Sequence, residues 1–124
     1  MKSTLNELEL ILNTIELYRD GHYHSDMQKL KKAFHPNAHI VGYSDGELLF
    51  ASRDQYLERR AKKKSSAELG ELSYTKILSL DKTDTTVVVK IESIISGTRF
   101  VSQLSMLKID DTWRIVAGLF HAET

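Results

Sequence analysis

The sequence has no cysteine, a single proline and no excess of either charge. Without cysteine, the chain can form no disulfide, no thiolate metal site and no cysteine nucleophile. Its 17 basic and 17 acidic residues cancel, so we expect no basic surface of the kind that binds phosphate backbones. These absences fit a reducing compartment and predict that the protein has no nucleic-acid partner.

Long apolar runs are also missing. Glu7 and Glu9 interrupt the apolar residues near the N-terminus, so we expect no signal peptide. No apolar run approaches the roughly 20 residues that a membrane-spanning helix needs. We therefore predict a cytoplasmic protein with no membrane partner. With 41% hydrophobic residues, residues 1–124 suffice for one domain with a buried core.

The first part of the chain has helical periodicity. Apolar residues recur at spacings of three and four over residues 5–18, which predicts an amphipathic helix. Thr4 and Glu7 form a capping-box pair at its start. We expect the helix to end at Asp20 and Gly21, because glycine readily adopts the left-handed C-cap conformation.

Two shorter helices are expected to follow. Ser25 and Gln28 form a capping pair that predicts the start of the second helix, and Pro36 predicts its end. Ser52 and Gln55 form a third pair, which predicts a short helix that continues to about residue 61.

From residue 72 the apolar period falls to two, which is typical of strands. The connections are short turns rich in Asp, Ser and Gly, so consecutive strands must be antiparallel. Helices first and strands afterwards predict an α+β fold, with three N-terminal helical segments on a curved sheet. The expected strands of this meander are residues 71–80, 85–96, 98–109 and 113–122.

The order of these segments resembles a known superfamily. Its best markers are Phe-His-Pro-Asn-Ala at 34–38, before the first strand, and Trp-Arg-Ile at 113–115, at the start of the last. Nearly the whole chain resembles the nuclear transport factor 2-like superfamily, and within it the putative lumazine-binding and SnoaL-like branches. The resemblance implies a cystatin-like cone, in which a curved mixed sheet wraps against helices around a pocket, and often a homodimer through the sheet face.

In such a cone, one side of the first strand points into the pocket. We favour the side of His39, Val41 and Tyr43, because the small residues on the other side suit close backbone packing; the alternative is that His39 and Tyr43 lie at the solvated rim. Counting by twos from Trp113 places His121 on the apolar face of the last strand, and a frayed, solvated His121 is the alternative there. The predicted ligand-binding residues are Tyr18, Phe34, His39, Val41, Tyr43, Phe50, Trp113, Leu119 and His121.

Two functions are consistent with these residues. The first is non-catalytic binding of a small planar or cyclic molecule, for which the lumazine-binding resemblance implies a pteridine-like ligand. The alternative is an isomerase, cyclase or dehydratase that uses His39 or His121 as the general base. The ketosteroid isomerases of the superfamily use a carboxylate base late in the first strand. The resemblance implies that this position falls on Gly42 here, and glycine cannot abstract a proton. We therefore favour binding.

Neither a metal nor a cofactor is predicted. His22 and His24 are expected to lie in an exposed loop between helices, and two histidines alone do not make a zinc site. The basic run at 59–64 is interpreted as a solvated helix end, because cations there complement the helix dipole. The later strands carry apolar residues on both faces. Because only one face can pack on the helices, the apolar residues of the other face predict a homodimer through the sheet.

Overall fold

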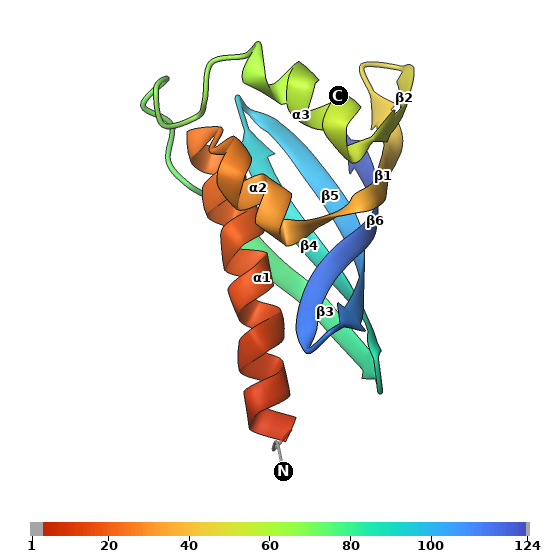
Figure 1. The fold of residues 1–124 in the computed structure, drawn as a ribbon. Helices are drawn as coiled ribbons and strands as arrows, with labels where there is room; N and C mark the ends of the chain where they lie inside the picture. Colours follow the sequence, from red (N-terminus) through yellow and green to blue (C-terminus); the bar gives the residue numbers. More distant parts are fainter. Residues whose placement is uncertain (1–3, 124) are drawn as a thin grey trace.

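The computed structural model describes residues 4–123, which form three helices and one six-stranded sheet (Figure 1). The predicted α+β class is confirmed. In chain order the elements are α1 (Thr4–His24), α2 (Met27–Ala33), β1 (Phe34–Ser44), β2 (Glu47–Ser52), α3 (Arg53–Ala61), β3 (Thr75–Thr83), β4 (Thr86–Ile95), β5 (Thr98–Ile109) and β6 (Thr112–Ala122).

The sheet has the strand order β2-β1-β6-β5-β4-β3 and does not close into a barrel. All neighbouring strands are antiparallel except β1 and β6, which are parallel, so the predicted mixed sheet is confirmed. The helices gather on one face, here called the inner face, and α3 packs against β1 and β2 (Figure 1). The opposite face is called the outer face. Within residues 4–123, no helix is both long and apolar enough to cross a bilayer.

Helix α1 continues past Gly21 to His24, so the predicted end of this helix was wrong. A Cβ at residue 21 would lie 2.7 Å from the side chain of Leu30, which is fully buried on α2. Gly21 therefore permits the close approach of α1 and α2, and the chain turns only at Ser25, whose φ is +50°. The predicted capping pair of Thr4 and Glu7 at the start of α1 stays a prediction, because the side chain of Thr4 lies outside the described side chains.

The two later helix starts had different outcomes. Helix α2 is capped by Asp26, which accepts hydrogen bonds from the amides of Gln28 and Lys29, so the predicted Ser25 cap was one residue early. The predicted capping box of Ser52 and Gln55 is present at the start of α3.

The four-strand meander is confirmed, although β3 begins at Thr75 rather than residue 71. Its turns contain residues with positive φ, including Asp84, Ser96 and Gly97, which matches the predicted turn chemistry. Strand β2 was not predicted as a separate element. It pairs with β1 through the turn at Asp45 and Gly46.

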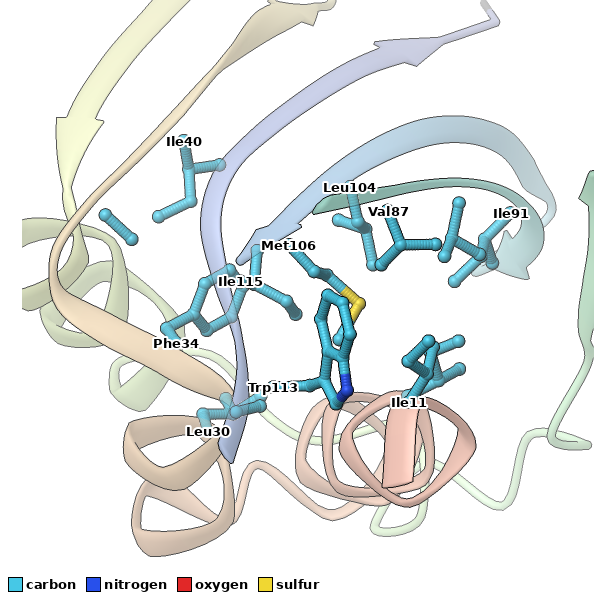
Figure 2. Close-up of a cluster of buried hydrophobic side chains, with 14 of the residues drawn as sticks. Ile11, Leu30, Phe34, Ile40, Val87, Ile91, Leu104, Met106, Trp113 and Ile115 are labelled. Atoms are coloured by element: carbon cyan, nitrogen blue, oxygen red, sulfur yellow. The ribbon is translucent and has the colours of Figure 1, made fainter. Parts of the chain in front are cut away.

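Trp113 lies at the centre of the buried core and is only 1% exposed (Figure 2). Its ring packs among Ile11 of α1 and Met106 of β5. The indole Nε1 donates to Glu7 Oε2 at 3.0 Å, and the other carboxylate oxygen of Glu7 pairs with Lys108 Nζ at 2.8 Å. Trp113 thus joins α1 to the sheet, and its predicted ligand-binding role stays a prediction.

Candidate ligand-binding site

A cavity of about 570 Å³ lies between α1, α3 and the inner face of the sheet. This volume falls within the range of small-molecule sites. Its apolar wall joins the core cluster, since Phe34, Ile40 and Leu104 belong to both (Figure 2). Phe100 and Phe120 continue this wall, with their ring centroids 6.5 Å apart. The wall therefore presents aromatic and aliphatic surface to an occupant.

A histidine and two tyrosines form a buried polar cluster in the lining of the cavity. His22 lies in the last turn of α1, and its Nδ1 donates to the carbonyl oxygen of Tyr18 at 2.8 Å. Because Nδ1 carries the proton in neutral imidazole here, Nε2 is left to accept a hydrogen bond from the hydroxyl of Tyr56 at 2.7 Å. Tyr18 hydrogen-bonds with Ser102 on β5. The cluster thus connects α1, α3 and the sheet.

Burial keeps this cluster uncharged. Burial, together with the positive charge of Arg60, lowers the pKa of His22 from its usual 6.5 to about 3. Burial also raises the pKa values of the Tyr18 and Tyr56 hydroxyls. At neutral pH the imidazole is therefore neutral and both phenols keep their protons, so the cavity offers hydrogen-bonding groups without a strong base.

Arg60 of α3 lies beside these groups and also lines the cavity. Its Nη2 donates to the carbonyl oxygen of His22 at 3.2 Å, where it caps a carbonyl in the last turn of α1. Its Nε is buried without a hydrogen-bond partner among the residues that the structure describes. The basic run at 59–64, predicted to be a solvated helix end, thus contributes Arg59, Arg60, Lys63 and Lys64 to the lining.

The segment from 62 to 74 borders the cavity between α3 and β3. The amide of Ala67 donates to the carbonyl oxygen of Tyr23 at 3.0 Å, and the Tyr23 hydroxyl donates to the carbonyl oxygen of Glu71. These bonds fasten the segment to the end of α1. It also presents Leu72, which is 90% exposed.

The predicted site residues separate into two groups. Tyr18 and Phe34 line the cavity; Leu119 also borders it, although its side chain is 55% exposed and faces outward from β6. The remaining predicted residues do not line it; they are His39, Val41, Tyr43, Phe50, Trp113 and His121. For those six, which lie outside this cavity, the predicted role in ligand binding stays a prediction.

The error on β1 concerns which side of the strand faces inward. Ile40 is buried and lines the cavity, whereas His39 and Tyr43 are exposed on the outer face. The small residue Gly42 also faces inward, because a Cβ there would lie 2.7 Å from the ring of Phe120. The close packing that small residues allow thus occurs on the inner face of the sheet.

His121 is exposed on the outer face because β6 contains a bulge. Ile115 pairs with Met106 and Ala117 pairs with Ser105, so Val116 is an extra residue in the ladder. An extra residue reverses the alternation of side chains. Residues 117, 119 and 121 consequently face outward, and the count by twos from Trp113 fails beyond Ile115.

Sequence reasoning missed His22, Tyr56 and Arg60. The wrong helix end at Gly21 placed His22 in a loop, whereas its spacing of four from Tyr18 is that of neighbours on one helix face. Tyr56 and Arg60 share the same spacing on α3, a signal that could have paired them. Across the described chain, no three His, Asp or Glu side chains gather as a metal site would require.

Comparison with known proteins supports this fold. Residues 6–121 match the family model described as "Putative lumazine-binding". A curated relative, Aldolase FrzH from Cladobotryum sp, is 29% identical and covers 96% of this chain and 94% of its own. An NTF2-like protein of unknown function from Silicibacter pomeroyi has a TM-score of 0.87 at 24% identity, covering 98% of this chain and 100% of that one. A similar protein from Shewanella baltica has a TM-score of 0.85 at 20% identity, covering 100% and 99%.

Proposed function

This chain belongs to the putative lumazine-binding family of the nuclear transport factor 2-like superfamily, and from that premise we propose that it binds a small planar or cyclic molecule without transforming it. The ligand occupies the cavity of about 570 Å³. The family description favours a pteridine-like ligand. A cytoplasmic location stays a prediction from the sequence.

The observation that carries this proposal is the uncharged polar cluster at an aromatic wall. A flat ring fits against Phe34, whose centroid lies 5.9 Å from Tyr18 and 6.2 Å from Tyr56. Fixed hydroxyl groups then orient the oxygen or nitrogen atoms of the ring. Because His22 has a pKa of about 3, it holds Tyr56 in place and is a weak base at neutral pH.

The test is a titration with the neutral fluorescent probe N-phenyl-1-naphthylamine, followed by displacement with lumazine. Ser102→Phe adds a ring to the inner face of β5, in the cavity lining, whereas the control Ser105→Phe adds the same ring to the outer face. We expect the wild type and Ser105→Phe to bind the probe and release it to lumazine, and Ser102→Phe to bind at least about tenfold more weakly. Equal affinity in all three proteins contradicts a ligand in this cavity.

A second candidate function is an aldolase-type enzyme, which the name of the relative from Cladobotryum favours. Carbon–carbon bond chemistry of this kind needs a base and donors for the developing oxyanion. His39 and His121, proposed from sequence as bases, lie on the outer face, so the candidates inside the cavity are His22, Tyr56 and the lining carboxylates. Turnover of a bound ligand that is lost in Tyr56→Phe favours the enzyme; an unchanged ligand favours binding.

We also propose a homodimer through the outer face. Four apolar side chains on the adjoining strands β2, β1 and β6 are more than half exposed: Leu48, Phe50, Tyr43 and Leu119. An exposed apolar group of this kind typically marks an interface. A second copy of the chain would cover it by two-fold symmetry.

A further inference from the structure

The lining of the cavity has an unequal distribution of charge. Five of its side chains are cationic and three are acidic, namely Asp45, Glu47 and Glu71. Arg19 is neutralised locally, since it pairs with Glu16 and Asp20. The excess of positive charge therefore lies on α3 and the turn that follows it, at Arg59, Arg60, Lys63 and Lys64.

These four cations differ from Arg19 in their pairing. None of them takes part in an ion pair among the residues that the structure describes. Several other cations of the described chain are paired: Arg99 contacts both Glu92 and Glu123, and Lys108 contacts Glu7. Four cations that form no ion pair with the described residues thus lie together along one side of the cavity, where they favour the entry of an anion.

Arg60 reaches furthest into the polar cluster. Its positive charge acts on Tyr18, His22 and Tyr56 together, and all three are uncharged at neutral pH. Only its Nη2 has a protein acceptor, and its Nε–H has none within the described chain. A guanidinium has five N–H donors, so most of the capacity of Arg60 is unused in the free protein.

We propose that the ligand carries a single carboxylate, which pairs with Arg60 while its planar body lies against the aromatic wall. This inference rests on the proposed binding function and names the class of its ligand. The planar fork of a guanidinium matches a carboxylate, and the hydroxyls of Tyr18 and Tyr56 supply neutral neighbours. A single negative charge is favoured over two because Glu71 also lines the cavity.

Sodium benzoate and benzamide test the charge directly, because they have nearly the same shape and differ by one negative charge. Each displaces N-phenyl-1-naphthylamine from the wild type, and we expect benzoate to act at about tenfold lower concentration. Equal displacement by the two compounds overturns the inference. If the neutral probe itself does not bind to the wild type, the proposed binding function fails instead.

Substitution of the arginine locates the charge. We expect Arg60→Gln to weaken benzoate about tenfold and to change benzamide by less than about twofold. Lys62→Gln is the matched control, because Lys62 is an exposed cation at the end of α3 that does not line the cavity. Equal losses for benzoate in both variants, or equal losses for both compounds in Arg60→Gln, contradict the assignment.

Arg60 also caps a carbonyl of α1, so its replacement can destabilise the fold. Circular dichroism melts establish that each variant is folded at the assay temperature. Arg60→Lys keeps the positive charge, and we expect it to retain a preference for benzoate over benzamide. Loss of that preference in a folded Arg60→Lys protein would also contradict a charge-based interaction, and the wild-type comparison stands whatever the variants do.

Discussion

His22 gives the clearest case of a residue whose surroundings set its chemistry. Its ring is held between the carbonyl oxygen of Tyr18, which requires the proton on Nδ1, and the hydroxyl of Tyr56, which donates to Nε2 when the ring is neutral. Burial and the charge of Arg60 lower the pKa of His22, and they outweigh the hydrogen bond to the Tyr18 carbonyl, which acts in the opposite direction. The residue therefore serves as a fixed acceptor for Tyr56.

The lowered pKa predicts a dependence of stability on pH. The unfolded chain protonates His22 below about pH 6.5, whereas the folded chain resists protonation until about pH 3. The unfolded state thus binds more protons across this window, so stability is full above pH 6.5 and decreases as pH falls. Between pH 7.5 and 5 we expect this residue to account for a loss on the order of 1–2 kcal/mol.

Urea unfolding at both pH values, for the wild type and His22→Gln, measures this contribution. We expect the variant to be less stable at pH 7.5 but to lose less stability on acidification. His24→Gln, at an exposed position two residues later, should keep the wild-type dependence. The same pH dependence in His22→Gln as in the wild type would show that residue 22 is not held neutral.

At the scale of elements, glycines and a bulge determine which side chains face the cavity. Gly42 on β1 makes room for Phe120 on β6, and the extra residue Val116 turns the end of β6 so that Phe120 points inward. Gly21 performs a similar role where α1 meets α2. The cavity therefore depends on close contacts between neighbouring elements as well as on the residues that line it.

Gly42→Ala and Gly118→Ala form a matched pair on the two parallel strands. A Cβ at residue 42 would lie 2.1 Å from the carbonyl oxygen of Phe120, so the strands must separate, whereas a Cβ at residue 118 meets only Leu104, at 3.5 Å. We expect a loss of about 3 kcal/mol for Gly42→Ala and less than about 1 kcal/mol for Gly118→Ala. Chemical denaturation measures both, and similar losses would argue against this packing.

The sequence predicted the elements better than the site for a physical reason. Capping at Ser52 and the turns before β4, β5 and β6 depend on local bonding, and local residues reveal it. The bulge at Val116 and the contact of Gly21 with Leu30 depend on a second element, which residue spacing does not report. Each of these contacts led to a wrong position for a histidine. His121 was expected to face the cavity, and His22 was expected to lie in an exposed loop.

On the scale of the whole molecule, the two faces of the sheet have different roles. The inner face carries the core and the cavity, and the outer face presents exposed apolar side chains on β2, β1 and β6. His39 lies on this outer face with its ring centroid 6.0 Å from that of Phe50. Three side chains selected from sequence as pocket residues, namely His39, Tyr43 and Phe50, thus lie on the face that we propose for the dimer.

Phe50→Glu tests the proposed dimer. Phe50 is 68% exposed on β2, so a charge there should not disturb the core but should oppose association. We expect sedimentation velocity to give a dimer for the wild type and a monomer for Phe50→Glu. Leu72→Glu is the control, since Leu72 is 90% exposed on the segment between α3 and β3 and should leave the dimer intact. A monomeric wild type would refute the interface.

The central claim is that a small molecule occupies the hollow lined by Tyr18, Phe34 and Tyr56. Native mass spectrometry of the protein purified gently from its own source tests this claim most directly, because it reports the mass of a retained ligand whatever its chemical identity. The account predicts one small-molecule mass retained by the wild type and by Ser105→Phe, and its loss from Ser102→Phe. Retention by all three proteins, or by none, would contradict it.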